Sequence, residues 1–155
     1  MISVLYVDDD LSLLDIGKLF LERSGEFRVE LRDSAISAMD LLNSSSFDII
    51  ISDYEMPGMN GLEFLKKVRT RYGEIPFILF TGRGREDVVI QALNDGADYY
   101  LQKGGDPKPQ FAELTHKIRL AVQRQKINEE LRESERRYRE VVETQSEFIT
   151  RFTPD

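Results

Sequence analysis

The chain has 155 residues, 41% of them hydrophobic and 32% charged, so it is long enough for one domain with a full core and too short for two of typical size. The formal net charge of -7, with basic residues interleaved among acidic ones, argues against a nucleic-acid partner. The absence of cysteine excludes disulfides and thiolate chemistry, and the single histidine, His116, does not build a metal site alone. The sequence shows neither a signal peptide nor a membrane-spanning run, so we expect a cytoplasmic protein without a membrane partner.

Short runs rich in β-branched and aromatic residues alternate along the chain with longer stretches of helical apolar periodicity. We predict five strands, at residues 2–7, 28–31, 49–52, 77–80 and 99–101, each followed by a helix. This alternation is typical of a parallel sheet with helices on both faces, because each right-handed crossover packs its helix against the sheet. The predicted fold class is α/β: a five-stranded parallel sheet in a doubly wound, flavodoxin-like (βα)5 arrangement with an extended C-terminal helix.

Polar residues and glycines mark the ends of the predicted helices. Asp10 and Ser34 are expected to cap the first and second helices, and Asn60-Gly61 to open the third. Gly96 is expected to close the fourth helix in a left-handed conformation. The periodicity that predicts the first helix rests on Leu11, Leu14, Leu19 and Phe20.

A long, highly charged stretch without glycine or proline runs from Gln110 to about Phe148, and it predicts a helix longer than the fold requires. One face of this helix carries a stripe with a seven-residue repeat, formed by Leu120, Ile127, Leu131, Ser134, Tyr138, Val141 and Phe148. Such a stripe is typical of a coiled coil that carries a signal. Because Arg124 and Gln145 interrupt it, a solvated helix with a chance stripe is the alternative.

Charged and polar residues follow four of the predicted strands. The first strand leads into Asp8-Asp9, the third into Asp53, the fourth into Thr81 and the fifth into Lys103. Because the carboxyl ends of parallel strands meet at one edge of the sheet, these side chains are expected to converge there. Asp8 or Asp9 with Asp53 would form a cup for a hard cation, of which Mg²⁺ fits best. Lys103 and the Thr81 hydroxyl would then face a phosphoryl group on Asp53.

Each of these residues also has an ordinary structural explanation. An isolated threonine at a strand end is usually a packing residue, and an isolated lysine is usually solvated. The joint placement at four strand ends is what favours a functional site.

About residues 1–122 resemble the receiver domain of two-component response regulators. The segments that carry the resemblance are Asp8-Asp9, SDYEMPGMNGLE around Asp53, FTG at Thr81, and YYLQK, which ends in Lys103. The resemblance implies that Asp53 accepts a phosphoryl group from a phosphohistidine on a histidine kinase or a histidine phosphotransfer protein.

The resemblance also implies roles for the neighbours of Asp53. Lys103 and Thr81 would contact the phosphoryl group, and Tyr100 would be a switch aromatic that turns inward when Thr81 moves. The implied ligands of Mg²⁺ are Asp8, Asp9, Asp53 and the backbone carbonyl of Glu55.

Two features depart from the family's common pattern or add to it. Gly104-Gly105 follows Lys103 where the family usually has a proline with a cis peptide, which makes the loop more permissive. Glu55 and Arg83 each lie two residues after a site residue, and we hypothesise that they pair across the site and slow hydrolysis of the acyl phosphate. Replacing Arg83 with alanine is then expected to change the lifetime of the phosphoryl group.

The end of the chain, ESERRYREVVETQSEFITRFTPD, resembles the opening of a PAS sensory domain. We therefore expect a receiver domain at 1–122, a helical linker at 123–145 and the start of a PAS domain at 146–155. The chain would then be the front of a longer protein, in which a kinase domain further along stays open, and the receiver itself is not expected to be an enzyme.

Alternative functions stay open at this point. One is a phosphorylation-independent dimeric interaction module, with a homodimer through the fourth helix, fifth strand and fifth helix or through the C-terminal helix. The other is a Mg²⁺-dependent phosphohydrolase that uses Glu55 as a second acid, although no insertion could supply its substrate cap.

Overall fold

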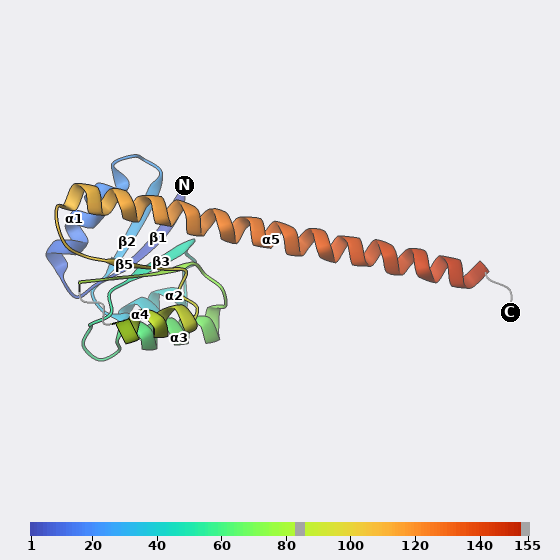
Figure 1. Cartoon of the computed structure of the whole chain (residues 1–155), viewed down its shortest axis with the longest axis horizontal. Coiled ribbons are helices and arrows are strands. Elements are labelled where there is room, and N and C mark those ends of the chain that lie inside the picture. The colour runs from blue at the N-terminus through green and yellow to red at the C-terminus, as the bar shows by residue number, and fades with distance from the viewer. Residues whose placement is uncertain (83–85, 153–155) are drawn as a thin grey trace. The chain divides into compact units, whose positions relative to one another are not determined.

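The computed structural model of the chain describes residues 1–82 and 86–152, with side chains as far as Thr144. Strands and helices alternate along it (Figure 1). The strands are β1 (Ile2–Val7), β2 (Phe27–Arg32), β3 (Ile49–Ser52), β4 (Phe77–Thr81) and β5 (Tyr99–Gln102). The helices are α1 (Leu11–Glu22), α2 (Ala35–Leu42), α3 (Gly61–Tyr72), α4 (Glu86–Asn94) and α5 (Pro107–Phe152).

The strands form one parallel sheet in the order β2-β1-β3-β4-β5, so the predicted fold class is confirmed. Val7 pairs with Arg32 of β2 and with Ser52 of β3, and β1 and β3 therefore end level with each other. The chain leaves β1 for one side of the sheet and later returns to the other side at β3. This reversal is where ligands bind in doubly wound sheets, and Asp8 and Asp53 follow the two strands that border it.

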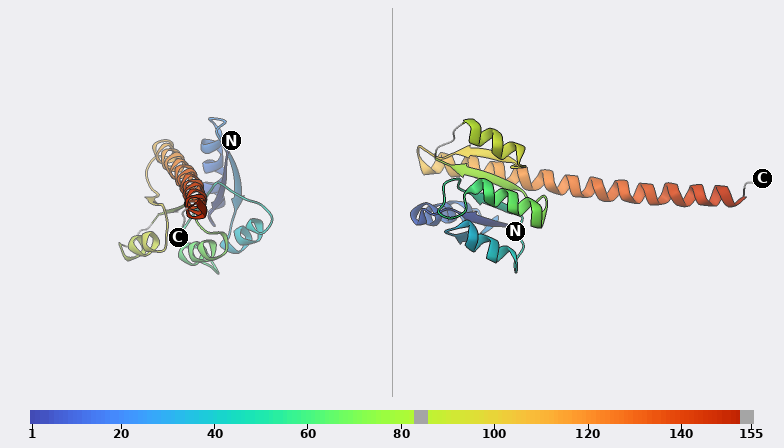
Figure 2. Two further views of the ribbon diagram at one scale, coloured as in Figure 1. Left: turned by 90° about the vertical axis from the view of Figure 1, so that its right-hand side faces the viewer. Right: turned by 90° about the horizontal axis from the view of Figure 1, so that it is seen from below.

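Two apolar layers cover the sheet. Helices α2, α3 and α4 pack on one face, and α1 with the first part of α5 packs on the other (Figures 1 and 2). Every residue of β3 and β4 is buried, as expected for central strands that are covered on both faces. The rigid sheet thus fixes the strand ends from which the polar side chains of the site project.

The expected caps are present. The Asp10 carboxylate accepts from the backbone N–H of Leu13 at 3.2 Å, and the Asn60 side chain accepts from that of Glu63 at 2.9 Å. The Ser34 hydroxyl caps α2 in the same way, and Gly96, with φ of +102°, follows α4.

Helix α1 differs from its predicted pattern. Its buried residues are Leu14, Gly17 and Leu21, whereas Leu11 and Leu19 are 61% and 70% exposed. The helix can press only one stripe against the sheet, and Leu14 and Leu21 define that stripe at a spacing of seven. Leu11 and Leu19 therefore form part of the surface.

Helix α5 begins at Pro107, three residues before the predicted start. Pro107 and Pro109 lie in its first turn, where a proline breaks no intrahelical hydrogen bond. The chain divides into two units, Met1–Val122 and Gln123–Asp155. Within the first unit, α5 buries Phe111, Leu114, Ile118 and Ala121.

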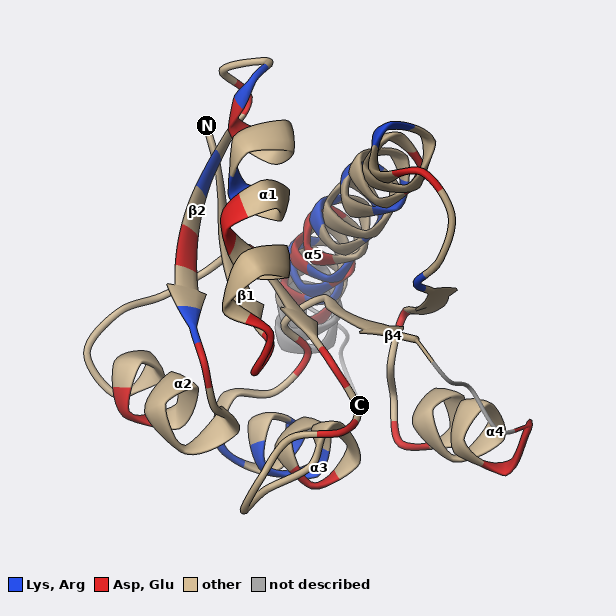
Figure 3. Ribbon diagram, turned by 90° about the vertical axis from the view of Figure 1, so that its left-hand side faces the viewer, with Lys and Arg blue, Asp and Glu red and all other residues tan. Residues whose placement is uncertain are grey.

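The second unit is a helix with an exposed apolar stripe. Basic and acidic residues are interspersed on α5 (Figure 3), and Glu133 pairs with Arg137 at 3.8 Å. The stripe residues Ile127, Leu131, Tyr138 and Val141 are all more than half exposed. Among the described residues, no helix has the length and apolar character that crossing a bilayer requires.

Candidate functional site

The hydrogen-bond ladder of the sheet continues one residue past the ends of β1 and β3 and holds two carboxylate residues. The backbone N–H of Asp8 donates to the carbonyl of Arg32 at 3.1 Å, and that of Asp53 donates to the carbonyl of Val7 at 2.9 Å. Asp8 and Asp53 are therefore fixed by neighbouring strands although both follow the last residue of a strand. Their side chains meet at the carboxyl edge, as the sequence predicts.

Three carboxylates converge there. Asp8, Asp9 and Asp53 each offer an oxygen, and these oxygens lie within 4.8 Å of one another. Asp8 is fully buried, Asp53 is 7% exposed and Asp9 is exposed. Clustered carboxylate oxygens that still reach solvent on one side are the donor set that a hard divalent cation such as Mg²⁺ takes.

Backbone N–H groups hold two of these carboxylates. The N–H of Asp10 donates to Asp8 Oδ1 at 2.9 Å, and the N–H of Tyr54 donates to Asp53 Oδ1 at 2.8 Å. The oxygens Asp8 Oδ2 and Asp53 Oδ2 both face Lys103, the first in a direct hydrogen bond and the second at 3.3 Å from Nζ. Both acids are therefore oriented before any ligand binds.

The charges of the cluster are incompletely balanced. Burial raises the pKa of Asp8 to about 6, the charge of Asp53 adds to the rise, and the hydrogen bond from Lys103 opposes it. Among the described residues, Lys103 is the ammonium that pairs with the cluster, and it contacts two of the three carboxylates, so the cluster favours a further positive charge. The Lys103 side chain is 15% exposed and its Nζ lies 5.7 Å from the centre of the Phe80 ring, on the apolar floor of the site.

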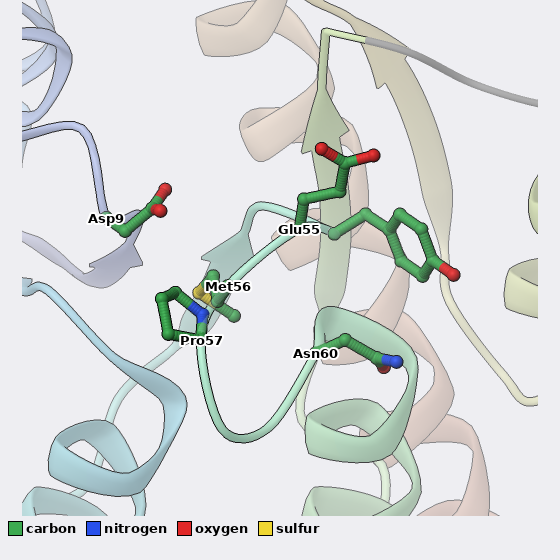
Figure 4. Close-up of a pocket in the computed structure, with 6 residues that line it drawn as sticks. Asp9, Glu55, Met56, Pro57 and Asn60 are labelled. Carbon is green, nitrogen blue, oxygen red and sulfur yellow. The ribbon is translucent and has the colours of Figure 1, made fainter.

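A cavity of about 420 Å³ opens beside the cluster, and Asp9 belongs to both (Figure 4). Figure 4 shows the Asp9 and Glu55 side chains on either side of this opening, with Met56 and Pro57 between them. The residues that line it are Asp9, Tyr54, Glu55, Met56, Pro57 and Asn60. The wall is thus formed largely by the loop that follows Asp53.

That loop folds back tightly onto the start of α3. The N–H of Gly61 donates to the carbonyl of Tyr54 at 2.8 Å, and Gly58 has φ of +84°, which favours glycine. A Cβ at Gly61 would lie 2.2 Å from the backbone oxygen of Asp53. The close approach of Gly61 therefore helps to set the position of Asp53.

Replacing Gly61 with alanine is expected to lower the free energy of unfolding by about 1–3 kcal/mol, because the added methyl forces the loop away from Asp53. Urea unfolding measures the change. Gly82→Ala is the control, since the nearest atom to a Cβ there is 4.0 Å away. Equal stabilities of the two variants would contradict the account of Gly61.

The residues expected to act as a switch, Thr81 and Tyr100, lie on β4 and β5. Thr81 is 2% exposed, and its carbonyl accepts from the N–H of Lys103 at 2.9 Å. Tyr100 is half-buried; its hydroxyl is shielded from solvent and has no hydrogen-bond partner in the described part of the chain. Burial raises the pKa of Tyr100. Arg83, the expected partner of Glu55, lies outside the described residues.

Two residues that support the site, Ser52 and Gln110, were not predicted from the sequence. The buried Ser52 hydroxyl donates to the carbonyl of Asp53 at 2.9 Å. The Gln110 side chain donates to backbone carbonyls on either side of Lys103. A serine inside an apolar strand was a signal for the first, whereas nothing in the local sequence marks Gln110.

Known proteins are similar to this chain. A family model described as the response regulator receiver domain matches residues 4–118. Response regulator Rre1 from Synechocystis sp. is 38% identical over 108 residues, which cover 68% of this chain and 47% of Rre1. Transcriptional regulatory protein FixJ from Bradyrhizobium diazoefficiens is 32% identical over 115 residues, which cover 74% of this chain and 56% of FixJ.

A solved receiver-domain structure is also similar to this chain. The receiver domain of the Francisella response regulator 1452 is 26% identical, with a TM-score of 0.72, and the match covers 81% of this chain and 99% of that one. The chain spans about half the length of Rre1 and FixJ. The matched residues 4–118 contain the acid cluster, Thr81 and Lys103, and the chain belongs to the response regulator receiver domain family.

Proposed function

We propose that the chain is the phosphoacceptor switch of a two-component phosphorelay and that Asp53 takes the phosphoryl group from a phosphohistidine. The donor would be a histidine kinase or a histidine phosphotransfer protein. The observation that carries the proposal is the Asp53 carboxylate, which lies 3.3 Å from Lys103 Nζ and within 4.8 Å of two further carboxylates. A nucleophilic oxygen beside a cation is what phosphoryl transfer by positioning and charge neutralisation needs.

In the proposed transfer, an oxygen of Asp53 forms a bond to phosphorus while the bond from phosphorus to the donor imidazole nitrogen breaks. The electron pair of the broken bond stays on that nitrogen. Lys103 would hold a phosphoryl oxygen through its ammonium and Thr81 through its hydroxyl. Asp8, Asp9, Asp53 and the backbone carbonyl of Glu55 would hold Mg²⁺, which supplies charge neutralisation at the phosphoryl oxygens.

The surface of α1 supports docking of the donor next to Asp53. Leu11, Ile16 and Leu19 are 61%, 39% and 70% exposed, on a helix that begins two residues after Asp9. Exposed apolar side chains beside a polar site are typical of a protein interaction surface. In this proposal they receive the protein that carries the phosphohistidine.

The output of the switch would pass through α5. Thr81 would move toward the phosphoryl group, and Tyr100 would change its packing against the layer formed by α2, α3 and α4. Glu55 at the mouth of the site would tune hydrolysis together with Arg83.

Partners downstream of the receiver are also part of the proposal. The exposed stripe on α5 from Ile127 to Val141 supports a coiled-coil homodimer over the linker at 123–145, with a PAS domain starting at 146–155. A second candidate surface for a homodimer is the face formed by α4, β5 and α5. It includes Ile90 and Leu93 of α4, which are 53% and 49% exposed.

Intact-mass spectrometry after incubation with acetyl phosphate and Mg²⁺ tests the proposal. We expect one added phosphoryl group on the wild type and on Asp33→Asn, an exposed control, and none on Asp53→Asn. Removing Mg²⁺ with EDTA is expected to abolish the addition. A folded wild type that gains no mass, or an Asp53→Asn variant labelled equally, would contradict the proposal and favour a phosphorylation-independent module.

A further inference from the structure

Few backbone hydrogen bonds hold the loop that follows Lys103 in place. Gly104 and Gly105 follow Lys103 with φ of +144° and +81°, values in the region that favours glycine, which has the widest choice of backbone conformations. The described part of the chain contains no cis peptide bond. Before the glycines, the N–H of Lys103 donates to the carbonyl of Thr81 at 2.9 Å. After them, Asp106 accepts from the N–H of Gln110 at 3.3 Å, where α5 begins.

The side chain of Gln110 holds the part of the loop between these two backbone hydrogen bonds. Gln110 Nε2 donates to the carbonyl of Gln102 at 3.2 Å and to the carbonyl of Gly104 at 3.3 Å. These two carbonyls belong to the residues directly before and after Lys103. A side-chain amide has two N–H donors, so it can hold both at once.

Gln110 is itself anchored. It is half-buried in the first turns of α5, and the next residue, Phe111, is 1% exposed. The Phe111 ring stacks on Phe20 of α1 with centroids 5.4 Å apart and meets Phe80 edge-on at 6.0 Å. The donor group thus projects from a part of the helix that the core holds in place.

We propose that Gln110 is a positioning residue for Lys103. It would act as a clamp, by holding the peptide groups on both sides of Lys103 through its two hydrogen bonds. The proposal rests on the proposed phosphoacceptor function, because it gives Lys103 the role of holding the phosphoryl group. The same two hydrogen bonds connect the loop of the site directly to α5.

The clamp has a consequence for the site. Lys103 Nζ contacts both Asp8 and Asp53, and a displacement of about an ångström would break that geometry. Without the clamp, the two glycines would let the loop sample conformations in which Nζ leaves the carboxylates. Loss of Gln110 should therefore slow phosphorylation without removing any group that touches Mg²⁺.

The first test is hydrogen exchange on the full chain, with Gln110→Leu compared with Gln123→Leu, which makes the same change at an exposed position of the same helix. In Gln110→Leu the backbone N–H of Lys103 is expected to exchange about threefold to tenfold faster, as the loss of modest hydrogen bonds allows. In Gln123→Leu it is expected to keep the wild-type rate. Equal exchange in both variants would overturn the proposal.

The second test is the rate of labelling by acetyl phosphate. Gln110→Leu is expected to slow it about threefold to tenfold while the dissociation constant for Mg²⁺ stays within about twofold of the wild type. A variant that merely loosens the fold would not separate these two quantities. In a Lys103→Met background, Gln110→Leu is expected to have no further effect, and an additive effect would overturn the proposal.

A measurement on the wild type covers the case in which Gln110→Leu does not fold. The side-chain amide protons of Gln110 are expected to exchange more slowly than those of Gln123, and equal rates would overturn the clamp. If the exchange results hold but the wild type takes no phosphoryl group, the clamp stands and the phosphoacceptor function fails.

Discussion

Replacing Lys103 with methionine is expected to slow labelling of Asp53 by acetyl phosphate on the order of a hundredfold, the usual effect of removing one preorganised donor from a transition state. Lys103 Nζ faces both Asp8 and Asp53, and methionine keeps much of the side-chain volume without the charge. The rate of mass gain at saturating Mg²⁺ measures the effect.

Measuring the affinity for Mg²⁺ distinguishes loss of the Lys103 ammonium from a general disturbance of the site. Removing a cation beside three carboxylates leaves them more negative, so Lys103→Met is expected to bind Mg²⁺ at least as tightly as the wild type. Lys108→Met makes the same change at an exposed position on α5 and should leave the labelling rate unchanged. Wild-type labelling of Lys103→Met, or an equal loss in Lys108→Met, would contradict the assignment.

The second large effect concerns stability at the opposite edge of the sheet. Arg69 of α3 donates to the carbonyls of Gly73 at 3.0 Å, Ile75 at 2.6 Å and Gly96 at 2.7 Å, and its guanidinium lies 3.5 Å from Asp98. It therefore connects α3 to the turns that precede β4 and β5. Because its side chain is only 19% exposed, Arg69→Met should lower the free energy of unfolding by about 2–4 kcal/mol.

A nearby arginine gives the control for this experiment. Arg71 lies on the same helix and is exposed, so Arg71→Met is expected to change the free energy of unfolding by less than about 0.5 kcal/mol. Chemical denaturation of both variants measures the difference. If Arg69→Met unfolds at the same denaturant concentration as Arg71→Met, the carbonyl contacts do not stabilise the fold as described.

The fold was predictable because its signals are local. Val4, Leu5, Ile50 and Ile51 lie in runs too short for helices and too apolar for exposed strands, and the alternation with helical stretches leaves few topologies. The convergence of Asp8, Asp53 and Lys103 then follows from the rule that parallel strands end at one edge. The positions of most site residues therefore follow from the ends of the strands alone.

What the sequence did not reveal depends on contacts between distant segments. Gln110 and Arg69 are ordinary polar residues on helices, and their roles come from backbone carbonyls that the tertiary fold brings to them. Leu11 and Leu19 fit an apolar pattern, yet the single stripe of α1 that meets the sheet leaves both exposed. Periodicity shows that a helix has an apolar face but does not say which of several apolar residues the neighbouring strands will cover.

The most direct measurement is the position of the phosphoryl group. After labelling with acetyl phosphate and Mg²⁺, reduction with borohydride converts an aspartyl phosphate to homoserine, which peptide mass spectrometry locates by residue number. The proposed function requires homoserine at position 53 and at no other acid of the cluster. Homoserine at Asp8 or Asp9, or none in a protein that has gained the phosphoryl mass, would contradict the central claim.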